Sequence, residues 1–240
     1  MHILVTRQIR EAEIFSKMLK SKNISHSIFP SIEIKNIKIS DDSINYLSSS
    51  DVLIFTSKNS FISIKDIMKN IELSTKKIIT IGLPTKLLIE NEGYNVEICP
   101  EEEYSSEELI KIIKDKDMFN GKKISIIKGE GGRSELQDFF LSRNYRYQDI
   151  ICYKRLVPSK IGSNLSDILN KTTHICVTST DIIKNMVGIV GADKLKKFIL
   201  IVGNDRIAKE CSKLLGINNF IISRNPSNKE MLETILRTNE

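Results

Sequence analysis

The amino-acid sequence predicts an α/β protein built from two similar, doubly wound halves. Short apolar runs alternate with amphipathic stretches of helical length, which is typical of parallel sheets covered by helices on both faces. The chain also repeats itself at a nearly constant offset. Eight apolar runs are expected to be strands: Ile3–Val5, Val52–Phe55, Ile78–Ile81, Val96–Ile98, Ile124–Ile127, Ile175–Val177, Phe198–Val202 and Phe220–Ile222.

The internal repeat divides the chain into two copies of one domain-sized unit. The segment that starts at Ile3 aligns with the segment that starts at Ser125, an offset of 122 residues. Three further pairs keep this offset to within one position: Ser57 with Ser179, Gly82 with Gly203, and Ser105 with Ser227. Four blocks in the same order indicate the duplication of a domain of roughly 120 residues, which is near the common domain size, and not a solenoid of short repeats.

Composition narrows the class of protein. The 240 residues are 40% hydrophobic and 28% charged, which is enough apolar material for a core. No apolar run reaches the roughly 18 residues needed to cross a bilayer, and the N-terminus lacks a signal-peptide pattern, so a cytoplasmic protein is expected. The net charge of +6 is dispersed along the chain, which does not indicate a nucleic-acid interface. The excess of positive charge suits binding of an anionic small molecule, and it fits a solvated Lys-rich surface equally well.

The cysteines form neither a metal motif nor a redox motif. They lie far apart, with no C-x-x-C pair and no histidine at ligand spacing: Cys99, Cys152, Cys176 and Cys211. We therefore expect buried, reduced thiols. No Ser-His-Asp set and no paired acid motif is visible either, so the chemistry is expected to need little from side chains.

Small polar residues follow the predicted strands, where doubly wound sheets bind ligands. Helix N-termini at these strand ends attract carboxylates or phosphates. The candidates in the first copy are Ser57, Lys58, Asn59, Gly82, Thr85 and Ser105, and those in the second are Lys128, Gly129, Arg133, Ser179, Gly203 and Ser227. Ordinary N-capping explains any single serine or threonine among them, whereas their repetition at matched positions favours a ligand site.

One of these loops is rich in glycine. Residues 128–133 read KGEGGR, and a backbone of this kind can approach an anion closely. The loop is neither a G-x-G-x-x-G motif nor a Walker motif, because no Gly-Lys-Ser/Thr follows. A nucleotide site is therefore not indicated.

In their order and spacing, these motifs resemble the uroporphyrinogen-III synthase family. The similar segments are ILVTR from Ile3, FTSKN from Phe55, IG from Ile81 with Thr85, GY from Gly93, IKGEGGR from Ile127, YKR from Tyr153, TS from Thr178 and VG from Val202. The resemblance spans almost the whole chain. This sequence departs from the family pattern at Gln8, where a proline is usual, and at Arg206, where threonine is frequent.

The resemblance implies two flavodoxin-like domains joined by a two-stranded linker, with a segment exchanged between the repeats. Domain one would comprise residues 1–31 plus 159–240, domain two residues 39–151, and the linkers residues 32–38 and 152–158. It also implies a cytoplasmic, monomeric lyase of tetrapyrrole and heme biosynthesis that uses no cofactor and no metal. Such an enzyme has no nucleic-acid or membrane partner, and it allows a transient contact with the preceding enzyme of the pathway.

The implied reaction cyclises hydroxymethylbilane, a linear tetrapyrrole with carboxylate arms, in the cleft between the domains, with inversion of the last pyrrole ring and loss of water. Thr6 and Arg7 then join the loop residues as candidates for substrate binding. Tyr153 is the candidate general acid for departure of the hydroxyl group, and a packed linker phenol is its alternative role. The alternative function is a non-enzymatic, two-lobed binding protein that clamps a small anion.

Overall fold

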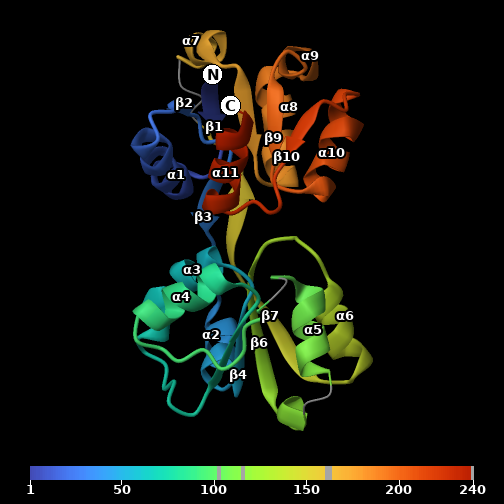
Figure 1. The fold of residues 1–240 in the computed structure, drawn as a ribbon. Helices are drawn as coiled ribbons and strands as arrows, with labels where there is room; N and C mark the ends of the chain where they lie inside the picture. Colours follow the sequence, from blue (N-terminus) through green and yellow to red (C-terminus); the bar gives the residue numbers. More distant parts are fainter. Residues whose placement is uncertain (102–103, 115–116, 160–163, 239–240) are drawn as a thin grey trace. The chain divides into compact units, whose positions relative to one another are not determined.

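The computed structural model describes residues 1–101, 104–114, 117–159 and 164–238, and its contacts divide the chain into two compact units (Figure 1). The discontinuous unit contains Met1–Glu33 and Leu156–Glu240, and the continuous unit contains Ile34–Arg155. Each unit contains one five-stranded sheet. The chain therefore leaves the discontinuous unit once and returns to it once.

The discontinuous unit is a doubly wound sheet. Its elements are β1 (His2–Val5), α1 (Ile9–Ser21), β2 (Ser25–Ile28), α7 (Leu165–Lys171), β8 (His174–Val177), α8 (Thr180–Val190), α9 (Ala192–Leu195), β9 (Ile199–Val202), α10 (Asp205–Leu215), β10 (Phe220–Ile222) and α11 (Asn228–Thr238). The strands run parallel in the order β2-β1-β8-β9-β10. In order of appearance this is 2-1-3-4-5, the order of flavodoxin-like sheets.

Helices cover this sheet because their apolar side chains recur every three or four residues. Phe15 and Leu19 of α1 pack with Met231 and Ile235 of α11 against β1 in one core cluster. Figure 1 shows α1 and α11 next to each other on one side of the sheet, with α8 and α10 on the other. The unit is therefore built in three layers.

The continuous unit repeats this architecture. Its elements are β3 (Glu33–Asn36), α2 (Asp41–Ser48), β4 (Val52–Phe55), α3 (Lys58–Met68), β5 (Lys77–Thr80), α4 (Leu83–Asn91), α5 (Ser106–Ile113), a 3-10 turn η1 (Asp117–Phe119), β6 (Lys123–Gly129), α6 (Glu135–Ser142) and β7 (Arg146–Leu156). The strand order is β5-β4-β6-β7-β3, in which β5, β4, β6 and β7 run parallel. The parallel strands at the centre of both sheets confirm the α/β, doubly wound fold class.

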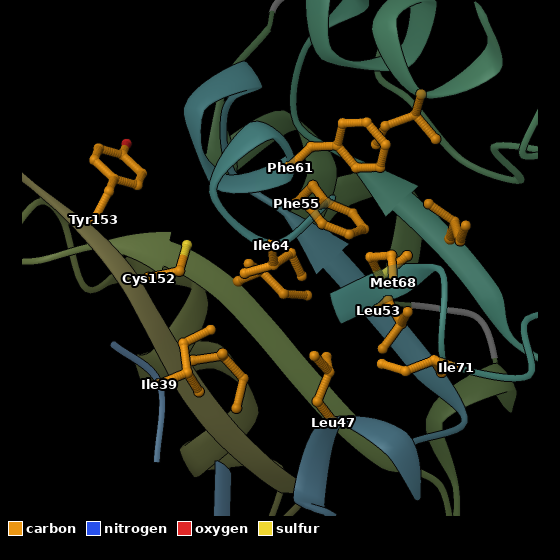
Figure 2. Close-up of a cluster of buried hydrophobic side chains, with 14 of the residues drawn as sticks. Ile39, Leu47, Leu53, Phe55, Phe61, Ile64, Met68, Ile71, Cys152 and Tyr153 are labelled. Atoms are coloured by element: carbon orange, nitrogen blue, oxygen red, sulfur yellow. The ribbon is translucent and has the colours of Figure 1, made fainter. Parts of the chain in front are cut away.

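Both faces of this second sheet are buried. Alternate residues of a strand point to opposite faces, so Leu53 and Phe55 of β4 enter one core cluster while Val52 and Ile54 enter another. Figure 2 shows the first cluster, where Phe55 meets Phe61 of α3 edge to face at 5.6 Å between ring centroids. This explains why β4 is an uninterrupted apolar run.

The predicted strand at Val96–Ile98 is wrong. Within the described residues this segment makes one isolated parallel bridge, between Ile98 and Ile79. Two backbone hydrogen bonds tie it to β5, and Pro100, which has no N–H to donate, follows almost at once. By the repeat offset this bridge corresponds to β10 of the discontinuous unit, so the same sheet position is kept in a reduced form.

The cysteines are free, and three are buried. Burial raises the pKa of Cys152, Cys176 and Cys211 to about 12, whereas Cys99 is partly exposed. Because the thiolate is the reactive form, we expect Ellman's reagent to label Cys99 in the native protein and the other three thiols only on unfolding. Rapid labelling of a native Cys99→Ser variant would contradict this.

Candidate functional site

A cavity of about 240 Å³ lies in the continuous unit, at the carboxyl ends of β4 and β6. The turn after β4, the glycine-rich loop after β6, the start of α5 and the end of β7 all contribute to its lining. It contains six of the residues predicted from the sequence: Ser57, Ser105, Lys128, Gly129, Arg133 and Tyr153. Carboxyl ends of parallel strands meet at one edge of a sheet, which is why residues far apart in the chain converge here.

Four other candidates of this unit do not line the cavity. Lys58 and Asn59 form the first turn of α3, Gly82 is the N-cap of α4, and Thr85 is buried in the first turn of α4. A Cβ at Gly82 would lie 3.6 Å from Cβ of Tyr104, which does line the cavity. These residues therefore belong to neighbouring turns of the same sheet edge.

A register shift in β7 aims Tyr153 at the cavity. Lys128 of β6 pairs with Ile151, but the next residue, Gly129, pairs with Tyr153, so that Cys152 is the extra residue of a bulge. As a result both Cys152 and Tyr153 are buried, although consecutive residues of a regular strand face opposite ways. In Figure 2 Tyr153 lies at the edge of the core cluster, apart from Leu53.

Gly129 makes room for the Tyr153 ring. A Cβ at this position would lie 2.5 Å from Cζ of Tyr153 and 2.9 Å from its hydroxyl oxygen. Both distances are well below van der Waals contact. The ring therefore packs directly on the backbone of the glycine-rich loop, and only glycine leaves space for it.

The Tyr153 hydroxyl takes part in two side-chain hydrogen bonds. Its oxygen lies 3.0 Å from Oγ of Ser57 and accepts a hydrogen bond of 2.9 Å from Nη2 of Arg155. The Arg155 guanidinium also stacks over the Tyr153 ring, 5.2 Å from its centroid. Ser57 in turn caps α3 through a reciprocal capping box with Ser60.

Two cations of the cavity already have acidic neighbours. Lys128 lies 3.5 Å from a carboxylate oxygen of Asp149, and its side chain is only 14% exposed. Gln137 Nε2 donates to both oxygens of the same carboxylate, at 3.1 and 3.0 Å. Arg133 contacts Glu107 and lies 3.6 Å from Glu135. An anionic ligand would therefore compete with these carboxylates for the two cations.

The candidates in the discontinuous unit fall into two groups, and none lines this cavity. Thr6 and Arg7 are buried: Thr6 donates to the carbonyl of Cys176, and Arg7 contacts Asn228 and donates to the carbonyl of Pro226 at 2.7 Å. Burial lowers the pKa of the Arg7 guanidinium from its usual value. These two side chains hold internal loops of the unit together.

The other three lie at strand ends. Ser179 caps α8 and Ser227 caps α11, each by accepting a backbone N–H at 3.3 Å. Gly203 follows β9, and a Cβ there would lie 2.7 Å from Cβ of Pro226. Serine capping is therefore observed at both positions, whether or not a ligand also binds there.

The structure adds lining residues that are not among the predicted site residues: Gln137, which lies in no motif, and Arg155 and Thr56, which belong to the YKR and FTSKN motifs. Gly131 and Gly132 of the glycine-rich loop also line the cavity, as the sequence of that loop predicted. Arg155 had a detectable signal, since it follows Tyr153 by two residues on a strand and so shares its face. Across the described ranges, no three His, Cys, Asp or Glu side chains are grouped closely enough to hold a metal ion. The described helices include none that is long and apolar enough to span a membrane.

The topology and the cavity together define a duplicated, doubly wound α/β protein whose site is built from hydroxyl groups, backbone amides and cations. The sequence matches the family model described as uroporphyrinogen-III synthase HemD over residues 15–233. The chain belongs to this family.

Similar proteins agree with this assignment. A curated protein of Methanocaldococcus jannaschii, described as "Putative uroporphyrinogen-III synthase", is 34% identical over 118 residues. That match covers 48% of this chain and 48% of the relative, so the chain spans about half the length of the curated relative it matches.

Two solved structures share the fold. The uroporphyrinogen-III synthetase of Helicobacter pylori has a TM-score of 0.70 at 17% identity, covering 99% of each chain. A mutant uroporphyrinogen III synthase of Thermus thermophilus has a TM-score of 0.66 at 11% identity, covering 100% of this chain and 99% of that one. At such identities the likeness concerns the fold alone.

Proposed function

We propose that this chain is a lyase of tetrapyrrole biosynthesis that cyclises hydroxymethylbilane to uroporphyrinogen III, with loss of water and inversion of the last pyrrole ring. The observation that carries this proposal is the family match over residues 15–233. The cavity supports it, since hydroxyl groups, cationic side chains and a glycine-rich backbone suit a ligand with carboxylate arms.

The size of the cavity limits what it can hold. Its volume of about 240 Å³ is below the roughly 300–1,000 Å³ of sites that enclose drug-sized ligands. It would therefore take one end of a linear tetrapyrrole and not the whole substrate. Holding that end in a fixed orientation favours one closure over the other, an effect worth roughly 7–11 kcal/mol in well-aligned cases.

The proposed roles of residues follow from this arrangement. Ser57, Ser105, Lys128, Gly129 and Arg133 would bind carboxylate arms at the cavity, and Tyr153 would supply the proton for departure of the hydroxyl group. The remaining predicted substrate-binding residues stay predictions: Thr6, Arg7, Lys58, Asn59, Gly82, Thr85, Ser179, Gly203 and Ser227. We also propose that the enzyme acts as a cytoplasmic monomer without a cofactor, and that it contacts the preceding enzyme transiently.

Product analysis tests the proposed function. Freshly made hydroxymethylbilane is incubated with the protein, and the porphyrin isomers are separated after oxidation. We expect mainly the type III isomer, whereas a sample without protein gives the type I isomer that forms spontaneously. Type I product alone, at the spontaneous rate, would refute the proposal, and retention of unreacted substrate by the protein would support the alternative of a binding protein.

A further inference from the structure

Three side chains at the cavity form a continuous hydrogen-bonded chain. Arg155 Nη2 lies 2.9 Å from the Tyr153 hydroxyl oxygen, which lies 3.0 Å from Oγ of Ser57. Ser57 Oγ also accepts the backbone N–H of Ser60 at 3.2 Å. Of the three hydrogen-bonded side chains, Ser57 is the one that caps α3 at the cavity.

The chemistry of the donors limits the directions in which protons are donated along these hydrogen bonds. A guanidinium can only donate, so the Tyr153 oxygen accepts from Arg155. Tyr153 is 1% exposed and its ring is pressed against Gly129, whereas Ser57 is only partly buried. The hydrogen bond between Tyr153 and Ser57 can run in either direction, and donation by the phenol gives its buried proton an acceptor. In that arrangement, with Ser60 N–H also bound to its oxygen, Ser57 has its own proton left to donate into the cavity.

We propose that Arg155, Tyr153 and Ser57 form a proton relay in which Ser57 is the group that protonates the leaving oxygen of the substrate. This inference rests on the proposed function, and it assigns Ser57 to proton transfer in place of carboxylate binding, with Tyr153 supplying the proton through Ser57. As the C–O bond breaks, the leaving hydroxyl takes the Ser57 proton and departs as water, and Ser57 takes the proton of Tyr153. The proton that the last pyrrole ring loses on closure returns to Tyr153 through Ser57, so the cycle is balanced.

Arg155 is a positioning residue in this relay. Its fixed positive charge lies next to the oxygen on which negative charge develops, and such preorganised charges stabilise a transition state without reorganising. Cooperative polarisation along a hydrogen-bonded chain adds to the effect. Tyr153 acts through Ser57 and does not itself need to reach the substrate.

Steady-state kinetics of single and double variants test the relay. We expect Arg155→Met to lower kcat about tenfold, the size expected for loss of a charge-assisted hydrogen bond near solvent, and to leave KM within about twofold. In a Tyr153→Phe background the same change should lower kcat no further, since the link is already broken. Lys154→Met is the matched control. Lys154 is a cation next to Arg155 on β7, but its side chain does not line the cavity.

Two Ser57 variants separate proton donation from helix capping. Ser57→Ala removes both, and we expect kcat to fall at least as far as in Tyr153→Phe. Ser57→Thr keeps a hydroxyl and a cap, and should recover most of the lost activity. Circular dichroism and urea unfolding show whether each variant is folded.

The possible failures can be told apart. Wild-type protein that yields only the type I isomer refutes the proposed function and the relay with it. If wild-type protein makes the type III isomer but Arg155→Met only raises KM in a salt-dependent manner, Arg155 binds a carboxylate and the relay is wrong. Losses of kcat that multiply in the Arg155→Met, Tyr153→Phe double variant also overturn it, because they show that the two residues act independently.

Discussion

Tyr153→Phe should lower kcat for uroporphyrinogen III formation by about 100-fold, the lower end of what general acid catalysis contributes. The phenylalanine ring fits the space against Gly129, so the loss falls on the hydroxyl and its bonds to Ser57 and Arg155. Losing these bonds should cost only about 1 kcal/mol of unfolding free energy. Isomer-resolved product formation under saturating substrate measures the effect.

The matched control for this variant is Tyr147→Phe. Tyr147 lies on the same strand, β7, but packs with the other core cluster of the continuous unit and does not line the cavity. Burial raises the pKa of its phenol. We expect the Tyr147→Phe variant to keep full activity. Full turnover by folded Tyr153→Phe would remove Tyr153 from the reaction and leave it a packed phenol, as the alternative interpretation holds.

Gly129→Ala should reduce activity as severely as removal of the phenol itself. The added Cβ would lie 2.5 Å from Cζ of Tyr153, so either the ring or the loop has to move. Moving the ring breaks its alignment with Ser57, and overpacking of this kind costs about 1–3 kcal/mol of stability. Kinetics and urea unfolding together measure both effects, and a combined Gly129→Ala, Tyr153→Phe variant should lose little further kcat.

Gly188→Ala is the control for adding a methyl group elsewhere. Gly188 lies inside α8, and a Cβ there meets no atom within 4 Å. Replacing a helical glycine by alanine should raise the unfolding free energy by about 0.5–1 kcal/mol and leave kcat unchanged. If Gly129→Ala is equally harmless, the close packing between the glycine-rich loop and Tyr153 does not matter for the reaction.

Seven strands could be predicted because each contains a short apolar run: β1, β4, β5, β6, β8, β9 and β10. The inner strand β7 and the edge strands β2 and β3 mix polar and apolar residues and are not among the predicted strands. Strand β2, Ser25–Ile28, contains three polar residues in four and therefore has no apolar run, and His2 bonds to its serine hydroxyls at 2.8 and 2.9 Å. Val96–Ile98 has an apolar residue on each side of Glu97 but forms only one bridge. At the edge of a sheet, the backbone hydrogen bonds and the packing against adjacent segments decide whether a segment forms a strand, more than its hydropathy does.

Residues of the candidate site could be predicted from the sequence only where a local pattern, such as the end of a recognisable strand, marks them. Strand ends identified Ser57, Lys128 and Gly129, because the topology brings such ends together. The burial of Arg7 was not predictable, since its partner Asn228 is 221 residues away in the sequence. The contact between Gly129 and Tyr153 likewise depends on a register shift that no single segment encodes.

That shift in β7 makes the number of residues in the strand as important as their identity. The extra residue at Cys152 reverses the alternation of side chains for everything that follows it. Deleting any one residue between Arg146 and Cys152 would restore a regular ladder, keep Tyr153 opposite Gly129, and turn only the residues between the deletion and Tyr153 to the other face. The extra residue therefore lets β7 place Ile150, Cys152 and Tyr153 on one core face, which a strand of strict alternation cannot do.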